Sequence, residues 1–322
     1  RPIKEMVLCN AAPLLIGENP LLHEQLFDKL YWGLTPKGQT GIGMHSISAI
    51  DIALWDIKGK ALNMPIYQLL GGARDKCQIY ATFGFEVYDR NALAEAATAW
   101  QEAGFNALKM TVANGGLKRR DEPRPLTGLI EEDVRRVASV REAIGSHAEL
   151  FIDANSSLDL FHARELCRQL EPYNIAFFEE PITQNDIPAM ADLRAHTSIR
   201  LACGQNEAQT YRFRDMLIAK AVDILQPNAA ISGGFTQCVK IAALADSFNI
   251  SVDNGGAWPF ANMHLQAGVS NGGLVEYHAS SVDACRQIYT GLPEVKDGFI
   301  TLPEAAGLGY DINLDSLPKF EI

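Results

Sequence analysis

Long apolar runs, paired cysteines and an excess of positive charge are all missing from this sequence. No stretch of about 18 consecutive apolar residues occurs, so nothing predicts a transmembrane helix, and the opening segment has no signal-peptide pattern. Lysine and arginine number 28 against 39 aspartates and glutamates, which leaves a formal charge of −11. That acidic balance argues against nucleic acid or an anionic membrane as a partner.

The six cysteines are scattered, and no two are spaced as Cys-x-x-Cys. This distribution favours reduced thiols and a cytoplasmic location. The chain enters a helical pattern at once, so we expect further residues to precede Arg1. With 47% hydrophobic and 21% charged residues, the 322 residues suit a large α/β domain with a smaller partner.

From Cys77 onward, short apolar runs rich in β-branched residues alternate with amphipathic segments. The predicted strands are 78–83, 107–112, 150–153, 175–178, 199–203, 222–225, 250–252 and 274–277. The predicted helices between them are 92–103, 132–144, 160–170, 187–195, 213–221 and 236–247. Each crossover helix returns the chain to the same end of the sheet, so the strands are expected to be parallel.

Eight such strands predict a (β/α) barrel, with catalytic groups at the carboxyl ends of the strands. A doubly wound open sheet is the alternative, but no Gly-x-Gly-x-x-Gly follows the first strand to favour it.

Polar side chains stand at the predicted strand ends, and three of them repeat at one interval. Asp153, Glu179 and Gln205 follow one another at intervals of 26 residues, about the length of one strand–helix unit. They are therefore expected to occupy equivalent places on adjacent strands and to converge. Two carboxylates and a third oxygen donor suit Mg²⁺. The alternative is that these residues cap the following helices or meet solvent.

Several motifs in order resemble the enolase superfamily, and within it the mandelate racemase/muconate lactonizing enzyme group. They are "AIDIALWDIKGKALNMPIYQLLGG" (Ala49–Gly72), "GFNALKM" (Gly104–Met110), "FIDAN", "FFEEP" and "KDGFITLPEAAGLGYDI" (Lys296–Ile312). The likeness spans nearly the whole chain.

This resemblance implies a modified TIM barrel, (β/α)₇β, with an α+β capping domain formed by the chain ends. Residues 1–75 would be the N-terminal part of the cap, with its opening strands missing. Residues 76–282 would form the catalytic barrel, and residues 283–322 would return to the cap. A Mg²⁺ ion would stabilise the enolate formed when a proton is removed from the carbon α to a carboxylate.

Asp153, Glu179 and Gln205 match the metal ligands of the group, which usually has a glutamate where this chain has Gln205. An amide oxygen can still coordinate Mg²⁺, but the ligands then contribute a charge of −2 in place of −3, which should weaken metal binding. Glu207 is an alternative third ligand if the strand end is shifted.

The usual acid/base positions differ more. The group's Lys-x-Lys pair is here Lys109 and Thr111, and its His–Asp pair corresponds to Asn254 and Asn228. None of Thr111, Asn228 and Asn254 can cycle a proton near neutral pH, so they are left as substrate-binding candidates. Lys109 could act as a base if its pKa is lowered, or could neutralise the substrate carboxylate.

Two residues at the end of the eighth strand complete the predicted site. Glu276 matches a position that, when protonated, can donate a hydrogen bond to the substrate carboxylate, and its alternative is a solvated or ion-paired side chain. His278 is a candidate acid, with a structural role as the alternative. The loop 113–128, with its basic run at 118–120, is either solvated surface or a lid that binds a polyhydroxylated acid.

Three functions fit these observations. The first is a Mg²⁺-dependent dehydratase of a hydroxy acid such as a sugar acid. The second is a racemase or epimerase, which needs proton donors on both faces of the substrate. The third is a metal- and carboxylate-binding barrel with little turnover. In each case the expected partner is a small carboxylate, and we expect a homo-oligomer.

Overall fold

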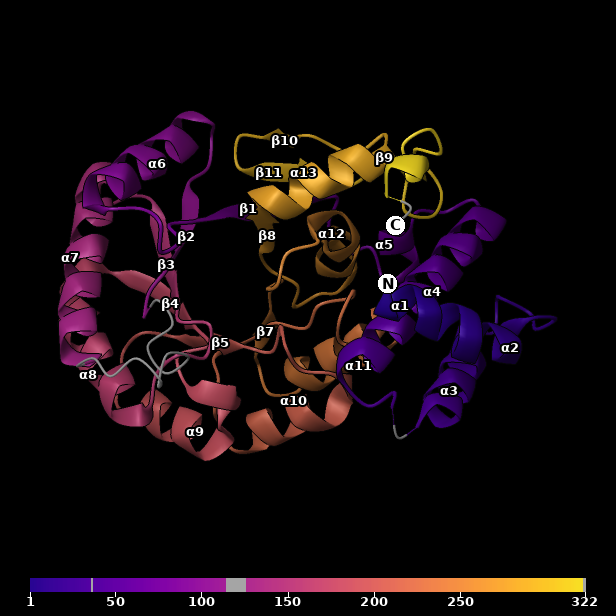
Figure 1. The fold of residues 1–322 in the computed structure, drawn as a ribbon, viewed down its shortest axis with the longest axis horizontal. Helices are drawn as coiled ribbons and strands as arrows, with labels where there is room; N and C mark the ends of the chain where they lie inside the picture. The colour runs from indigo at the N-terminus through magenta and orange to yellow at the C-terminus, as the bar shows by residue number, and fades with distance from the viewer. Residues whose placement is uncertain (36, 114–125, 321–322) are drawn as a thin grey trace.

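The computed structural model describes residues 1–35, 37–113 and 126–320. Parallel strands run in the order β1 to β7, and β8 pairs with β1, inside a ring of helices (Figure 1). The strands are β1 (Lys76–Phe83), β2 (Ala107–Thr111), β3 (Glu149–Asp153), β4 (Ile175–Glu179), β5 (Leu201–Cys203), β6 (Ile224–Leu225), β7 (Ser251–Val252) and β8 (Val275–His278). All eight predicted strands are present, and the TIM-barrel-like fold is confirmed.

The seam between β7 and β8 differs from the other strand pairs. No ladder joins these two strands within the described part of the chain. Backbone hydrogen bonds make the connection, from Val252 N–H to Asn271 O at 2.9 Å and from Gly273 N–H to Val252 O at 2.8 Å. The bond from Asn254 N–H to Leu274 O, also 2.8 Å, continues this contact to the rim.

The helices outside the strands begin where the sequence supplies caps. Asp89, Asp159 and Asp186 each accept a hydrogen bond from the backbone N–H three residues later, which satisfies a free donor of the first turn. The helices are α6 (Arg90–Glu102), α7 (Leu126–Ile144), α8 (Leu160–Leu170), α9 (Ile187–Ala195), α10 (Gln209–Ile218), α11 (Gly234–Asp246), α12 (Pro259–Gly268) and α13 (Ala279–Ile288). Single turns of 3₁₀ helix lie at Glu171–Tyr173 and Thr183–Asn185.

The interior of the barrel is a layer of apolar side chains, one from each of β1 to β6. Its members are Tyr80, Ala107, Phe151, Phe177, Ala202 and Ile224. Three of the six are aromatic rings, and the rings of Phe151 and Phe177, on adjacent strands, stack at 4.1 Å. The layer fills the barrel below the carboxyl ends of the strands, so it forms the floor of any site there.

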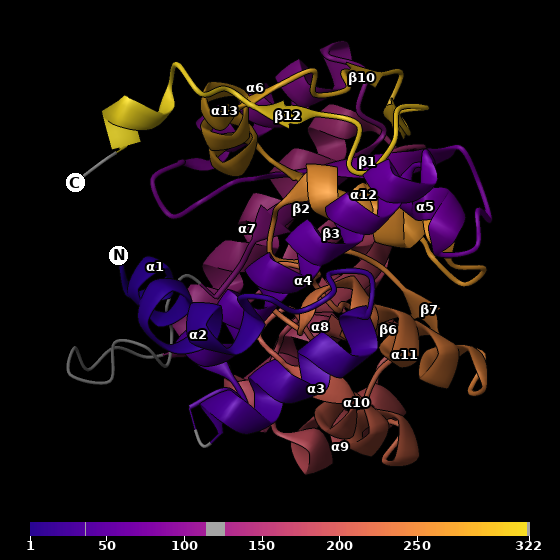
Figure 2. The ribbon, with the colours of Figure 1, turned by 90° about the vertical axis from the view of Figure 1, so that its right-hand side faces the viewer.

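The N-terminal residues form a helical cap beside the barrel, which faces the viewer in Figure 2. Its elements are α1 (Pro2–Met6), a π-helical turn (Val7–Ala11), α2 (Ala12–Leu15), α3 (His23–Leu34), α4 (Gly41–Leu62) and α5 (Ile66–Leu69). Phe27, Leu30, Met44 and Ile47 form its apolar core, which also includes Ala208 from the barrel. The cap therefore packs directly on the rim of the barrel.

The C-terminal residues return to the cap after contacting the first strand. Their elements are β9 (Tyr289–Thr290), β10 (Val295–Lys296), β11 (Phe299–Thr301), β12 (Asp311–Ile312) and a 3₁₀ turn (Leu317–Phe320). β11 pairs antiparallel with β1. Beyond it, Gly307 O accepts from Ile66 N–H at 2.9 Å, and Leu308 N–H donates to Asp56 Oδ1 at 2.8 Å. The domain boundaries at 75/76 and 282/283 stay predictions, although β1 does begin at Lys76.

A buried carboxylate attaches the cap to the barrel. Asp51 of α4 accepts a hydrogen bond from Thr236 N–H at 3.0 Å, in the first turn of α11. Gly234 makes this approach possible, because a Cβ there would overlap the Asp51 carboxylate and because its φ of +74° disfavours other residues. Burial, with a smaller contribution from the charge of Glu24, raises the pKa of Asp51 to about 7.

This raised pKa predicts a pH-dependent attachment. Protonated Asp51 is favoured in the folded chain, so its stabilising contribution is fully present below about pH 4 and is lost as the pH rises to about 7. Asp51→Asn should remove this dependence. The free energy of unfolding of the wild type, relative to that of the variant, should fall by a few kcal/mol between these pH values. Urea denaturation of both proteins at several pH values measures it, and parallel curves would contradict it.

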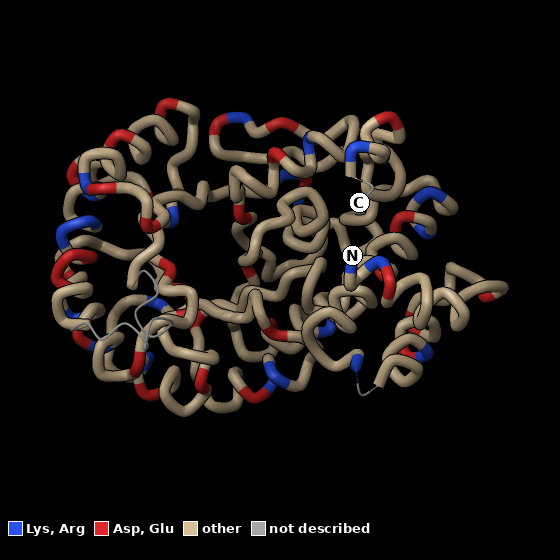
Figure 3. Tube along the Cα trace, in the orientation of Figure 1, with Lys and Arg blue, Asp and Glu red and all other residues tan. Residues whose placement is uncertain are grey.

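Charged residues of both signs are interspersed along the outer helices (Figure 3). The six cysteines are free thiols, and only Cys9 is exposed. None of the described helices is long and apolar enough to span a membrane.

Candidate metal and substrate site

Strand register brings three predicted site residues to one level of the barrel. Thr111 on β2 is paired with Asp153 on β3, and Asp153 with Glu179 on β4. Side chains at paired positions of parallel strands point to the same face. Thr111, Asp153 and Glu179 are all buried at this rim, so the structure brings Asp153 and Glu179 together as the sequence predicts.

The ammonium group of Lys109 lies among three carboxylates. Its Nζ is 2.5 Å from Glu179 Oε2, 2.9 Å from Glu276 Oε1 and 3.4 Å from Asp153 Oδ2. The Lys109 side chain is 1% exposed, and each carboxylate is 5% exposed or less. Coulomb interactions are strong at this depth, so Lys109 holds the acidic cluster together.

The pKa of Lys109 bears on the two roles that the sequence leaves open for this residue. Burial alone would lower this pKa, but the charges of Glu179 and Glu276 outweigh burial and hold it well above its ordinary value. This direction favours the ammonium form of Lys109 and, of the two roles, neutralisation of the substrate carboxylate.

Glu276 differs from the expected protonated acid. Its Oε1 accepts from the Thr82 hydroxyl at 2.5 Å and its Oε2 from Ala257 N–H at 2.7 Å. Although burial opposes it, Lys109 and these two donors hold the pKa of Glu276 below its ordinary value. In this structure Glu276 is therefore a hydrogen-bonded carboxylate.

A cavity of about 290 Å³ lies over the cluster at the carboxyl ends of the strands. It is lined by Thr82, Phe85, Thr111, Asp153, Asn155, Gln205, Gly256, Ala257, Glu276 and His278. His278 is opposite Thr82 in the β8–β1 pair, and Thr82 is opposite Lys109 in the β1–β2 pair. The imidazole and the acidic cluster therefore share one rim of the barrel.

His278 is held from two sides. Its Nδ1 lies 2.9 Å from the Ser280 hydroxyl, and its ring lies 5.5 Å from that of Phe85. These contacts leave Nε2 as the nitrogen available to a substrate. Thr111 also lines the cavity, but its hydroxyl donates to Gly84 O at 2.7 Å.

Asn228 and Asn254 lie below the cavity surface. Asn228 Nδ2 donates to the carbonyl oxygens of Gly255, Gly256 and Ala257, and its Oδ1 accepts from Ala230 N–H and Asn262. Asn254 Nδ2 donates to Gly255 O, and its Oδ1 accepts from Glu276 N–H. Neither is among the described residues that line the cavity. Both amides shape the 255–257 turn, and this departs from the substrate-binding role expected of them.

Gln205 lines the cavity and belongs to a second network. Its Nε2 donates to Glu180 Oε2 at 3.0 Å. Glu207, the alternative ligand, accepts from Arg212 at 3.2 Å and from Asn185 at 3.3 Å. These bonds engage both carboxylate oxygens of Glu207, which is also absent from the described lining of the cavity, and this disfavours Glu207 as a metal ligand.

The residues at this rim suit a hard cation, although the third candidate ligand, Gln205, is an amide and not a carboxylate. No group of three His, Cys, Asp or Glu residues in the described chain has the arrangement of a metal site, since the third candidate is an amide and Lys109 lies between the acids. Glu179 Oε1, however, is buried and has no hydrogen-bond partner among the described residues. Together with the oxygens of Asp153 and Gln205, it forms an oxygen-donor set that suits Mg²⁺.

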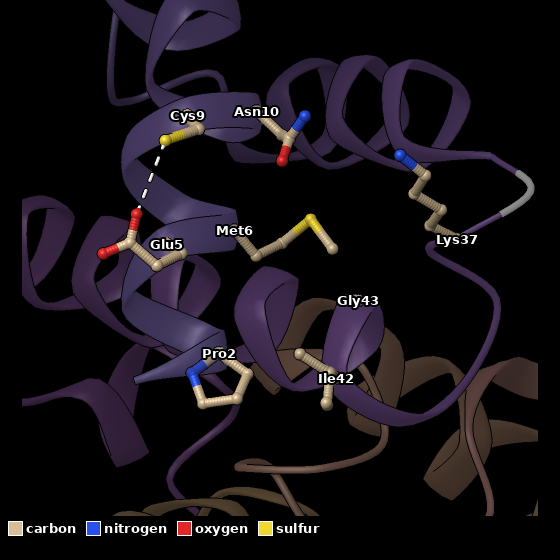
Figure 4. Close-up of a pocket in the computed structure, with 8 residues that line it drawn as sticks. All are labelled: Pro2, Glu5, Met6, Cys9, Asn10, Lys37, Ile42 and Gly43. Carbon is tan, nitrogen blue, oxygen red and sulfur yellow. Dashed lines mark hydrogen bonds between the residues drawn. The ribbon is translucent and has the colours of Figure 1, made fainter.

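Two other cavities, each of about 500 Å³, lack such a cluster. The one in Figure 4 lies in the cap, where the Cys9 thiol donates to Glu5 Oε2 at 3.6 Å and Lys37 lies on the opposite wall. The other lies between cap and barrel and is mostly apolar, with Trp258, Tyr289 and Tyr310 in its lining. The cavity at the strand ends is therefore the candidate site.

The sequence analysis missed the contribution of β1. Thr82 bonds Glu276 and stands two residues after Tyr80, whose ring lies in the interior layer. This alternation would have placed Thr82 on the inner face. The predicted lid, residues 113–128, falls mostly outside the described residues.

Comparisons with known proteins agree with this geometry. Residues 91–316 match the enolase C-terminal domain-like family. An arabinonate dehydratase of Saccharolobus solfataricus is 31% identical over 306 residues, which cover 93% of this chain and 78% of the relative. A D-galactarolactone cycloisomerase of Agrobacterium fabrum is 32% identical over 324 residues, with 96% and 82% covered.

A solved structure extends the likeness to the whole fold. The L-talarate dehydratase of Polaromonas sp. JS666, complexed with Mg and L-glucarate, superposes with a TM-score of 0.87 at 29% identity. The superposition covers 98% of this chain and 84% of that one. Residues 1–71 match the mandelate racemase/muconate lactonizing enzyme N-terminal domain. With both domains matched, this chain belongs to the mandelate racemase/muconate lactonizing enzyme group of the enolase superfamily.

Proposed function

We propose that this protein is a Mg²⁺-dependent dehydratase of a sugar acid. The observation that carries the proposal is the cavity at one rim of the barrel, where Asp153, Glu276 and His278 line the wall. The buried ammonium group of Lys109 lies beneath it, in contact with Asp153 and Glu276. Relatives named as dehydratases of arabinonate, galactonate and xylonate support the reaction and the substrate class.

Asp153, Glu179 and Gln205 would hold the metal. When bound, Mg²⁺ would lower the pKa of the proton α to the substrate carboxylate by drawing charge onto the carboxylate oxygens. Gln205 leaves the ion with more net positive charge than a third carboxylate would, which favours an anionic substrate.

Three side chains of the protein have the other roles in the proposed reaction, which are binding the substrate carboxylate and transferring the proton. Lys109 is a buried ammonium group, and it neutralises and orients the substrate carboxylate. Glu276, held by Thr82 and Ala257, keeps Lys109 in place. His278 carries the proton, because a ring nitrogen of its imidazole can accept and return a proton, whereas the hydroxyl and amide side chains of the described lining cannot.

Dehydration suits this set better than racemisation. Loss of a β-hydroxyl requires removal of one proton and protonation of the leaving oxygen, which a single imidazole can perform in turn. Racemisation requires donors on both faces of the α-carbon, and the positions across the barrel are amides bonded to backbone. A cytoplasmic location and a homo-oligomeric state remain predictions.

The test is α-proton exchange in D₂O with Mg²⁺ over a panel of sugar acids. Exchange with loss of water supports the dehydratase, exchange with inversion would indicate a racemase, and no exchange would contradict turnover. His278→Asn should lower kcat on a substrate found in this way by about 10²- to 10⁴-fold, because general acid–base catalysis contributes that much. His147→Asn, on the exposed turn before β3, is the matched control and should retain wild-type kcat.

A second candidate is a metal- and carboxylate-binding barrel with little turnover. The amides at Asn228 and Asn254 favour it, since both side chains serve the backbone of the 255–257 turn. Carboxylate binding by calorimetry without exchange of the α-proton would support this function in place of the first.

A further inference from the structure

We infer that Glu180 is a positioning residue, which fixes the side-chain amide of Gln205 so that the amide oxygen faces the cavity. The inference rests on the proposed metal site. A glutamine ligand has a difficulty that a glutamate lacks, because only one of its two ends can coordinate a cation. An amide turned by 180° would present its NH₂ group to Mg²⁺ and would not bind it.

The contacts of Gln205 resolve that ambiguity. Gln205 Nε2 donates to Glu180 Oε2 at 3.0 Å. A carboxylate accepts hydrogen bonds and does not donate them, so the NH₂ end is held toward Glu180. The amide is planar, and Oε1 is therefore directed away from Glu180. Oε1 lies beside Gly256, which lines the cavity and where a Cβ would come within 3.0 Å of it.

Glu180 is itself fixed in place. Asn206 Nδ2 donates to both of its oxygens, at 2.9 and 3.0 Å, and Asn185 Nδ2 donates to Oε1 at 2.9 Å. Its backbone has a φ of +41°, which is uncommon for a residue with a Cβ. Glu180 N–H donates to Ala202 O, and its carbonyl accepts from Ser156 N–H. A buried acceptor with this many amide partners gives Gln205 one stable orientation.

The arrangement also makes Gln205 and Glu180 a matched pair. A glutamate at position 205 would place a second carboxylate about where Nε2 now lies, 3.0 Å from Glu180. Like charges at that distance repel. Gln205→Glu alone should therefore fail to tighten Mg²⁺ binding, which differs from the effect expected of an added carboxylate ligand.

A four-member cycle tests the pairing: wild type, Glu180→Gln, Gln205→Glu and the double variant, each titrated with Mg²⁺ by calorimetry. Glu180→Gln should weaken binding by about 10- to 100-fold, the range for lost partners of metal ligands. The double variant restores a donor opposite an acceptor, so it should bind at least as tightly as the wild type. The two substitutions should thus be strongly non-additive.

Glu207→Gln is the matched control, because Glu207 also accepts from Asn185 but has no described bond to Gln205. It should leave the Mg²⁺ affinity unchanged, and circular dichroism should show the native fold in all five proteins. Three outcomes would overturn the inference about Glu180 without affecting the proposed metal site. They are additive effects of the two substitutions, an unchanged Mg²⁺ affinity of Glu180→Gln, and an equal loss of Mg²⁺ affinity in Glu207→Gln. Folded wild-type protein that binds no Mg²⁺ would overturn the metal site and the inference together.

Discussion

Replacing Lys109 by methionine should lower the free energy of unfolding of the metal-free protein by about 3–5 kcal/mol, the usual effect of removing one partner of a buried ion pair. Methionine fills most of the space of the lysine stem, so the loss is mainly electrostatic. Asp153, Glu179 and Glu276 would then be buried together without the cation that now contacts all three. Urea denaturation in the presence of a chelator measures the change.

Mg²⁺ should recover part of that stability, because a bound cation supplies the charge that the substitution removes. Lys60→Met is the matched control: Lys60 also contacts two acids, Asp56 and Asp311, but at the surface, where water screens the interaction. It should change the free energy of unfolding by less than about 1 kcal/mol. Equal effects of the two substitutions would contradict the central role of Lys109.

Replacing Asp153 or Glu179 by alanine should remove Mg²⁺ binding below the detection of calorimetry. Each substitution deletes one of only two carboxylates in the proposed donor set, and the amide of Gln205 cannot compensate for the lost charge. Glu179→Ala also removes the nearest acid to Lys109, so its stability should be measured beside its metal affinity.

The control for these variants is Glu149→Gln. Glu149 begins β3, the strand that Asp153 ends, and is exposed at the opposite end of the barrel. Its replacement should leave Mg²⁺ affinity unchanged. Full Mg²⁺ affinity in Asp153→Ala, with a native circular dichroism spectrum, would show that the metal site lies elsewhere.

The two asparagines of the site, Asn228 and Asn254, bear on which residues carry out each part of the proposed reaction. The resemblance to the group would give Asn228 and Asn254 the positions of its His–Asp pair. In this structure their side chains support the 255–257 turn, whose Ala257 N–H binds Glu276. The cavity therefore depends on these amides for its shape, and the proposed reaction assigns proton transfer to His278 and binding of the substrate carboxylate to Lys109. The kcat of the His278→Asn variant tests this assignment.

Much of this protein follows from its sequence alone, for a physical reason. A buried strand is a short apolar run and a packed helix has an apolar stripe, so both are visible locally, and all eight strands and six helices are found where the patterns predict them. The equal spacing of Asp153, Glu179 and Gln205 also predicts their shared position correctly. Strand–helix units of equal length end their parallel strands at the same rim of the barrel.

What the tertiary structure decided is the state of each side chain at that rim. Whether Lys109 is a base or an ammonium group depends on which carboxylates surround it, and two of them, Glu179 and Glu276, lie 70 and 167 residues away in the chain. Which end of the Gln205 amide faces the cavity depends on its hydrogen bond to Glu180. Whether Asn228 and Asn254 can bind a ligand depends on the backbone of the 255–257 turn, which already occupies their side-chain amides. Charge state and hydrogen bonding are set by neighbours in space, and local sequence patterns do not contain them.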